Sequence, residues 1–283
     1  MGATRDARVT ALLLAPAALF LGAWFLLPLA QLFRLSLGGR EGPLHAYREV
    51  LGSVVYQRVF LNTLLVALVV TIVCLALAYP TAFVLARLRG GLRAVAFYCV
   101  LVPFWISLLV RTYAWMLLLG TQGPVNAALI TVGLVNQPLP LLFNTTGVLI
   151  GMVHVLLPYA ILPIYAAMVK VDERLLLASD GLGAPPAITF RRVYLPLTLP
   201  GVTAGAVFVF LLGLGFFVTP ALLGGLGNLM VATLVETLVN ERLAWALAAA
   251  ASFTLLGTIL VLLAVAVRFV SLGAVLSGGG TGR

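Results

Sequence analysis

Residues 175–201 read LLLASDGLGAPPAITFRRVYLPLTLPG, a stretch punctuated by glycine and proline that separates two long apolar segments. Residues 178–184 predict a short helix that ends at Gly183, because glycine takes the left-handed conformation at a helix end without steric cost. A proline pair comes next and suits the start of a second short helix. Pro196 and Pro200 are expected to interrupt that helix. The stretch therefore predicts two short helices that meet at a corner.

The composition of the chain indicates a membrane protein. Hydrophobic residues make up 63% of the sequence and charged residues only 9%, whereas soluble domains have roughly one half and one quarter. Six apolar runs reach the ~20 residues that span a bilayer core: 9–33, 62–86, 94–119, 146–168, 202–223 and 244–267. We expect each run to be a helix, because a lipid-exposed backbone must satisfy its own hydrogen bonds.

The predicted fold class is an all-α membrane protein with about six transmembrane helices. We expect a single transmembrane domain over residues 1–276 and a disordered tail at 277–283. The first run is longer than the ~7 to 15 apolar residues of a signal peptide, so we expect it to be retained. Cys74 and Cys99 lack CxxC spacing and a histidine cluster. They are therefore predicted to be small buried hydrophobes, with no disulfide or metal.

The basic residues predict an orientation in the membrane. Placing both termini in the cytoplasm puts eleven of the 17 lysines and arginines inside, including three arginines in the short loop 87–93. Four arginines count against this choice, but they fall in a loop of moderate length, where the rule is weaker: Arg34, Arg40, Arg48 and Arg58. The net charge of +9 is then explained by membrane borders, so no nucleic-acid partner is expected.

The spacing within residues 177–196 resembles the cytoplasmic coupling loop of ABC importer permeases, whose pattern is Glu-Ala-Ala, three residues, Gly, nine residues, Ile-x-Leu-Pro. The glycine of that pattern matches Gly183. Leu177 stands where the family usually has Glu, and Ser179 where it has Ala. The resemblance implies that the loop, about residues 171–200, docks on a separate ATPase. The implied coupling residues are Leu177, Ala178, Ser179, Asp180, Gly183, Ala184, Phe190, Val193, Leu195 and Pro196.

Four stretches resemble the sequences of spermidine/putrescine-type permeases of the same family: residues 102–107, 111–115, 136–144 and 215–225. This resemblance implies a type I ABC importer permease-like bundle in a bacterial inner membrane. It also implies three kinds of partner: a second permease, identical or different, two ATP-binding subunits and an extracytoplasmic solute-binding protein. A polyamine such as spermidine or putrescine is the best guess for the solute, while iron, thiosulfate and other small solutes stay open.

Polar and aromatic side chains inside the apolar runs are candidates for a translocation path. They are Arg111, Tyr113, Trp115, His154, Tyr159, Thr219 and Glu236. A straight helix from Ala94 would place Arg111 about 26 Å across the membrane, where it could either anchor the helix or line a path. His154 could be a packing residue or a substrate contact. For a polyamine, Glu236 would supply charge pairing, and aromatic rings would supply cation-π contacts.

The sequence lacks the motifs that support common catalytic chemistry. It contains no GxxxxGK[ST], HExxH or GxSxG motif. We therefore expect a transport subunit that is not an enzyme, binds no cofactor and relies on ATP hydrolysis by a partner. Two alternatives are an ion-gradient-driven secondary transporter, although no internal repeat is seen, and a membrane-embedded enzyme.

Overall fold

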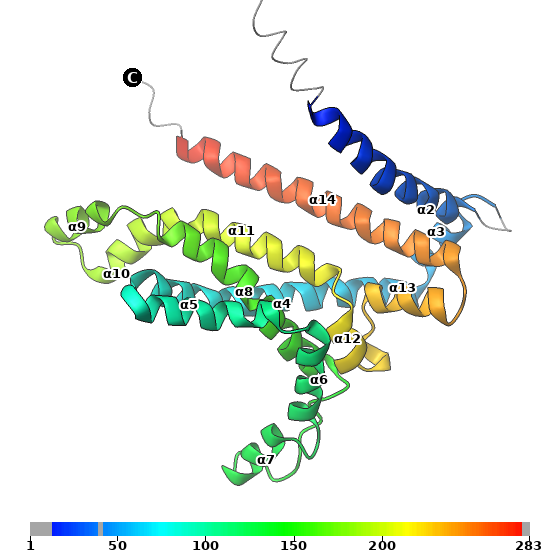
Figure 1. Ribbon diagram of the computed structural model, residues 1–283, viewed down its shortest axis with the longest axis horizontal. Coiled ribbons are helices and arrows are strands. Elements are labelled where there is room, and N and C mark those ends of the chain that lie inside the picture. The colour runs from blue at the N-terminus through cyan, green and yellow to red at the C-terminus, as the bar shows by residue number, and fades with distance from the viewer. Residues whose placement is uncertain (1–12, 39–41, 279–283) are drawn as a thin grey trace, which may run out of the picture. The chain divides into compact units, whose positions relative to one another are not determined.

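Helices joined by short connections make up the computed structural model, which describes residues 13–38 and 42–278 (Figure 1). No strand lies in these ranges. Five of the described helices are long and apolar enough to cross a membrane, and the count reaches six when one bent helix pair is taken as one span. The predicted all-α class with about six transmembrane helices is confirmed.

The described residues form two compact units. One contains residues up to Gln57 together with those from Leu234 onward, and the other contains Arg58–Thr233. The boundaries fall inside two helices, α4 (Val54–Arg87) and α13 (Val231–Asn240). The single domain over residues 1–276 stays a prediction.

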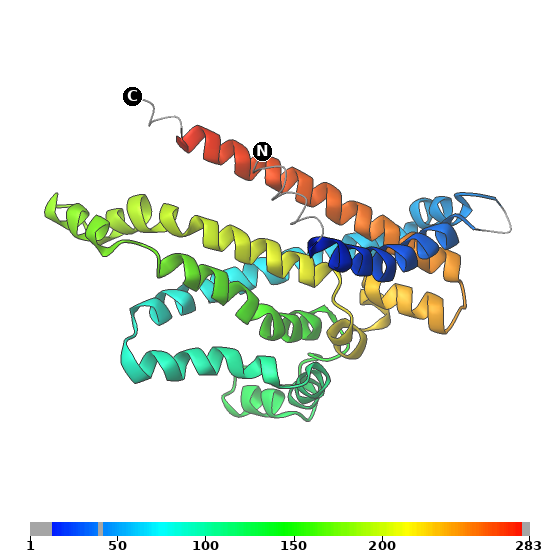
Figure 2. The same ribbon diagram turned by 45° about the horizontal axis from the view of Figure 1, so that its top comes forward.

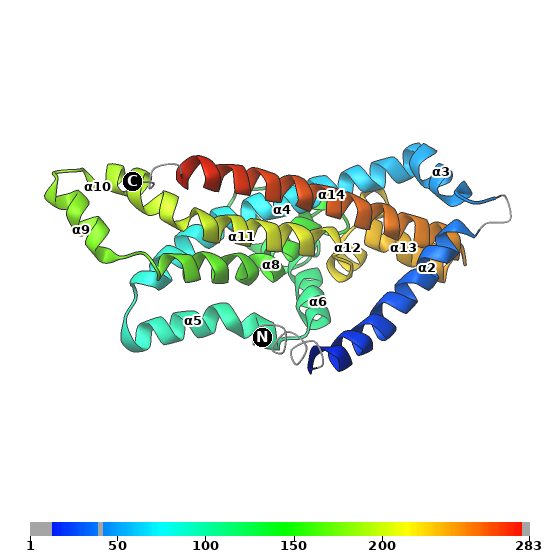
Figure 3. The same ribbon diagram turned by 90° about the horizontal axis from the view of Figure 1, so that it is seen from above.

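Three long helices carry the core of the Arg58–Thr233 unit: α4, α8 (Thr145–Met168) and α11 (Leu195–Leu214). Helices α8 and α11 lie side by side in Figures 1 and 3. At Gly201 an added Cβ would lie 2.5 Å from the Cβ of Ala167 on α8. Small residues let two membrane helices approach this closely, and dispersion between them replaces the hydrophobic driving force that lipid cannot provide.

The third apolar run is broken, so the single helix expected over residues 94–119 is wrong. Helix α5 (Gly90–Trp105) ends before Ile106, and α6 (Leu108–Leu119) starts two residues later. The directions of Gly90–Trp105 and Leu108–Thr131 differ by 98°. Figure 3 shows α5 and α6 nearly perpendicular to each other. Pro103 lies in the last turn of α5, where its missing N–H leaves a helix carbonyl without a partner.

The fifth run also differs from the expectation. The helix that starts at Pro186 continues to Leu214, so Pro196 and Pro200 do not end it. A π turn, η2 (Phe190–Tyr194), precedes Pro196, and this change of hydrogen-bond register accommodates a residue without an N–H. The helix instead stops at Gly215, and the short α12 (Val218–Leu223) follows.

A connection without charged residues follows α6 and contains the short helix α7 (Pro124–Thr131). Asn126 on α7 is completely buried. Its side-chain amide donates to the carbonyl oxygens of Gly120 and Leu139, 3.0 Å each, and its Oδ1 accepts from the Leu139 N–H at 2.8 Å. One side chain thus closes the loop between residues 120 and 139.

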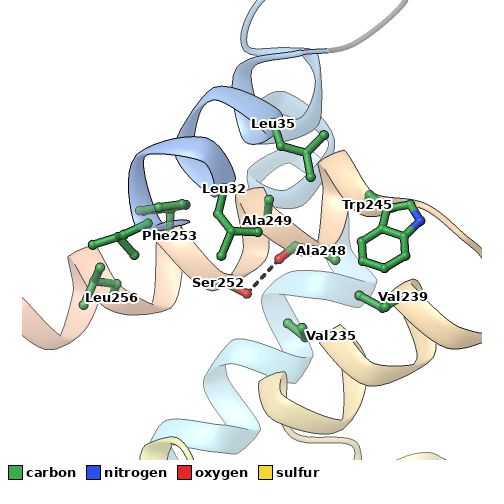
Figure 4. Close-up of a pocket in the computed structure, with 11 residues that line it drawn as sticks. Leu32, Leu35, Val235, Val239, Trp245, Ala248, Ala249, Ser252, Phe253 and Leu256 are labelled. Atoms are coloured by element: carbon green, nitrogen blue, oxygen red, sulfur yellow. Dashed lines mark hydrogen bonds between the residues drawn. The ribbon is translucent and has the colours of Figure 1, made fainter. Parts of the chain in front are cut away.

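The other unit contains α2 (Leu27–Leu37), α3 (His45–Gly52), the end of α13 and α14 (Trp245–Gly278). The Phe33 and Phe253 rings meet edge to face, with centroids 5.2 Å apart. Figure 4 shows an apolar groove of about 230 Å³ between α2, α13 and α14. The Ser252 hydroxyl in the lining donates to the Ala248 carbonyl at 2.8 Å, so its hydrogen bond is made within α14.

Helix α14 includes the first two residues of the tail expected at 277–283. Residues 279–283 lie outside the described residues, so the disordered tail stays a prediction. The described residues contain two further short turns: η1 (Gly22–Leu26), a π turn that leads into α2, and η3 (Leu226–Asn228), a 3₁₀ turn that follows α12.

Candidate functional site

The corner predicted near Gly183 is present. Helix α9 (Glu173–Gly181) begins where the Asp172 carboxylate accepts the Arg174 N–H at 2.9 Å. Gly183 has a φ of +76°, as predicted, and its N–H donates to the Asp180 carbonyl at 2.9 Å. Figures 1 and 2 show α9 and the following turn at one end of the paired helices α8 and α11.

A side-chain hydrogen bond ties the two helices of the corner together. The second helix, α10 (Pro186–Thr189), carries Thr189, whose hydroxyl lies 2.8 Å from the Ser179 hydroxyl on α9. Ser179 occupies the position where the resembling family usually has Ala. The departure therefore adds an internal hydrogen bond at the corner. Ala184, which follows the turn, is half-buried.

An aromatic cluster joins the corner to the long helix α4. Phe83 of α4 packs edge to face on Tyr194 and Phe190 of η2, with centroids 5.5 and 6.2 Å apart. Tyr79 also packs on Phe190, and its hydroxyl lies 3.1 Å from the Thr198 hydroxyl of α11. Edge-to-face ring pairs of this kind add to the stability of a contact beyond the area they bury, so the cluster fastens η2 to α4.

Apolar side chains of the corner remain exposed. Leu182 is 88% exposed and Leu177 is 68% exposed. Ile188, on the second helix α10, is also exposed. Ala178, Asp180 and Pro196 are exposed as well, while Val193 and Leu195 are half-buried. Large exposed leucines on a polar segment mark a surface suited to another protein.

A second group of predicted residues meets where α6, α8 and α12 approach. The Trp115 indole N–H donates to Nδ1 of His154 at 3.0 Å, and the two rings meet edge to face. This bond requires Nδ1 without a proton, so a neutral His154 carries its hydrogen on Nε2. The hydroxyls of Thr112 and Thr219 lie 3.5 Å apart in the same region.

Arg111 lies one helical turn before Trp115 on α6. Its Nε atom is buried and has no hydrogen-bond partner among the described residues. The straight helix assumed for the 26 Å depth is wrong, because the bend at Ile106 lies between Ala94 and Arg111. Whether Arg111 anchors the helix or lines a path stays a prediction.

Three predicted path residues are not part of this group. Tyr113 is 53% exposed on another face of α6. Tyr159 packs on Phe104, with ring centroids 5.0 Å apart. Glu236 accepts a hydrogen bond from Asn240 at 3.2 Å and belongs to the other unit.

Comparison with known proteins assigns the chain to a family. The sequence profile of the family described as binding-protein-dependent transport system inner membrane component matches residues 75–269. The chain belongs to this family. The match includes the corner at Gly183 and the group around His154.

Named relatives and solved structures agree with this membership. Spermidine/putrescine transport system permease protein PotB of Escherichia coli K12 is 37% identical over 200 residues, which cover 71% of this permease and 73% of that protein. PotB of Haemophilus influenzae is also 37% identical, with 73% of each chain covered. A bacterial alginate ABC transporter chain has a TM-score of 0.76 at 18% identity, covering 93% of each chain, and so shares the fold. A chain of the MetNI methionine ABC transporter has a TM-score of 0.59 at 17% identity, covering 76% of this permease and 94% of that chain.

The described part of the permease holds no group of three or more His, Cys, Asp and Glu side chains that could bind a metal. Cys74 is buried, as predicted, and its thiol lies 3.7 Å from the Val153 carbonyl. The expectation for Cys99 is wrong, because this side chain is exposed on α5. An apolar run predicts membrane insertion, but it does not say which helix face is covered.

Sequence reasoning missed several residues that shape the permease. The Ser179–Thr189 bond and the aromatic cluster around Phe83 carry no sequence motif. The close α8–α11 contact does carry one, since Gly201-Val-Thr-Ala-Gly205 is a GxxxG pattern in an apolar helix.

Proposed function

We propose that this chain is the permease subunit of an ABC importer that forms, with a second permease, the path for a polyamine such as spermidine or putrescine. A solute-binding protein delivers the polyamine, and two separate ATP-binding subunits supply the energy. Both termini lie in the cytoplasm, so that the corner at Gly183 faces the ATPase. The two permease copies form either a homodimer or a heterodimer.

The corner at Gly183 carries this proposal. It combines exposed leucines, which suit a protein partner, with an aromatic anchor on α4 that links the corner to a long apolar helix. ATP-driven closure of a partner ATPase would move the corner and, through the anchor, bias the permease between two states. Leu177, which replaces the usual Glu, extends the apolar part of this docking surface.

The polyamine is supported by the identity to PotB and by the aromatic side chains of the path. Within residues 58–233, Asp and Glu occur only at 172, 173 and 180, all next to or within α9. Away from α9, this unit therefore offers a polyamine aromatic rings such as Trp115, and no carboxylate. Charge pairing is assigned to Glu236 and to the second permease.

Reconstituted transport tests the proposal. Vesicles containing this chain, a second permease and the ATP-binding subunit should take up labelled spermidine only with ATP inside and loaded binding protein outside. Gly183→Val should leave the chain in the membrane and abolish most uptake, while Gly181→Val, two residues away with a normal φ and open surroundings, should retain more. Uptake by this chain alone on a proton or sodium gradient would replace the proposal with a secondary transporter.

Cysteine labelling tests the orientation separately. A cysteine at Pro185 should react only from the cytoplasmic side, and one at Gly123 only from the outside. The native exposed cysteine at Cys99 is first replaced by Ala to remove background labelling. The reverse pattern would exclude docking of the corner on a cytoplasmic ATPase.

A further inference from the structure

A basic pocket lies where the ends of the long helices meet the segment that contains the corner. Its volume is about 270 Å³. Its walls come from the end of α4, the start of α5, the residues after α8, the first turns of α9, and η2. Arg87, Arg89 and Arg93 line one side, and Glu173, Leu176 and Tyr194 line the other.

The three arginines of this pocket lack internal counterions. Each is exposed, and none forms an ion pair with a carboxylate of the described residues. Arg87 is held in place by the Phe83 ring, since its guanidinium carbon lies 3.8 Å from the ring centroid. Glu173 is the one acidic side chain in the lining, so the pocket has a net charge of +2 from three arginines and one glutamate.

This arrangement fits a phosphate group. A guanidinium donates paired hydrogen bonds that match the oxygens of a phosphate. Helix α5 starts between Arg89 and Arg93 with no side-chain cap, so the unpaired N–H groups of its first turn add positive potential. The anion would therefore find donors from both side chains and backbone.

The position of the pocket indicates where the phosphate comes from. Arg87 ends one candidate membrane span and Met168 ends another, while Gly90 begins the bent pair. The pocket thus lies at the level of the helix ends, where phospholipid headgroups lie in a bilayer. Met168, Val169 and Leu176 give it an apolar wall against which the glycerol and the start of an acyl chain can pack.

We propose that this pocket binds the phosphate headgroup of an anionic phospholipid and that the bound lipid holds α9 against the end of α4 and the start of α5. The headgroup bridges Arg89 and Arg93 to the wall formed by α9 and η2. An effect of the lipid on uptake rests on the proposed function, because it requires α9 to move with an ATPase. Lipid binding itself does not depend on the proposed function.

Lipid retention by the purified full-length chain tests the proposal without any partner protein. The chain is titrated in mixed micelles with phosphatidylglycerol or with phosphatidylcholine, and bound lipid is counted by native mass spectrometry. Wild type should prefer phosphatidylglycerol. Arg89→Gln/Arg93→Gln should lower its affinity roughly thirtyfold, since the attraction of each basic residue to an anionic surface corresponds to about fivefold.

Two further single variants are expected to bind phosphatidylglycerol more tightly than wild type or equally well. Glu173→Gln removes the repulsive carboxylate and should tighten phosphatidylglycerol binding several-fold. Arg58→Gln changes an exposed arginine at the far end of α4 and should leave binding unchanged. The proposal predicts tighter lipid binding for Glu173→Gln, which misfolding cannot produce. The test therefore remains decisive even if the double variant folds poorly.

Three outcomes would overturn it. The first is equal phosphatidylglycerol retention by wild type, the double variant and Glu173→Gln. The second is competition by inorganic phosphate at concentrations equal to those of the lipid, which would identify a free anion as the ligand. The third is a double variant that retains lipid normally but loses affinity for the ATP-binding subunit, which would make the pocket a protein contact.

Discussion

The corner at Gly183 and the α8–α11 contact at Gly201 both require glycine, but for different reasons. At Gly183 an added Cβ would meet no atom within 4 Å, and the restriction comes from the φ of +76°. At Gly201 the backbone is an ordinary helix, and the restriction comes from Ala167, Pro163 and Ile164 on α8, 2.5 to 3.1 Å from the added atom. Glycine is required at position 183 by the local backbone conformation. At position 201 it is required by a helix more than thirty residues away in the sequence.

Gly201→Ala is expected to have the largest effect. The new methyl group would overlap the Pro163 carbonyl, a backbone atom that cannot rotate away, so α8 and α11 must separate. Overpacking of this kind costs about 3 kcal/mol of unfolding free energy. Unfolding titrations in mixed micelles measure the loss of stability. If the unfolding midpoint of the variant equals that of wild type, the two helices are not in close contact at Gly201.

Gly151→Ala should cost less, about 2 kcal/mol, because its neighbours are side-chain atoms that can shift. The added Cβ would lie 2.6 Å from the Leu223 Cδ1 and the Thr219 Cγ2. Displacement of Thr219, a candidate path residue, should also lower the uptake rate. Unfolding and transport should be measured on the same preparation. If stability falls but the uptake rate does not change, Thr219 is not a path residue.

Gly183→Ala should destabilise the corner by about 1 kcal/mol, the cost of a left-handed conformation for a residue with a Cβ. The cost is local, so the unfolding of the helix bundle should change little while ATP-driven uptake falls. Limited proteolysis of the α9–α10 corner measures the local effect. If proteolysis and uptake both match wild type, positive φ at this residue does not position the corner.

Gly181→Ala is the matched control, with the smallest effect and the opposite sign. Gly181 ends α9 with a φ outside the left-handed region and no neighbour within 4 Å of an added Cβ. Alanine should stabilise α9 by about 0.5 kcal/mol, because the unfolded chain loses freedom. Increased proteolysis of this variant would indicate that the corner tolerates no side chain at all, whatever the backbone conformation.

Much of the fold was predictable from contiguous residues. The apolar runs correctly indicated five spans and the presence of a further apolar segment, and glycine followed by two prolines indicated the corner. Two breaks were missed, at Ile106 and at Gly215. Pro103 gave a signal for the first, but proline alone does not decide a break, since Pro158 and Pro163 lie inside an uninterrupted α8.

The candidate path was only partly predictable. Trp115 and His154 were both singled out by their residue types, yet their hydrogen bond joins positions 39 apart in the sequence. The same types gave Tyr113 as a candidate, although it is exposed on another face of α6. Residue type indicates what a side chain can do, whereas the packing of the helices decides which side chains meet.

The sequence by itself determined the membrane class, the approximate spans and the left-handed turn at Gly183. These depend on the length of an apolar run or on the sterics of one residue, both of which are local properties. Only the tertiary structure decided that Ser179 bonds Thr189, that Phe83 anchors η2 to α4, and that three arginines line one pocket. Those features depend on atoms brought together from different helices, and their positions are fixed by packing that no single segment encodes.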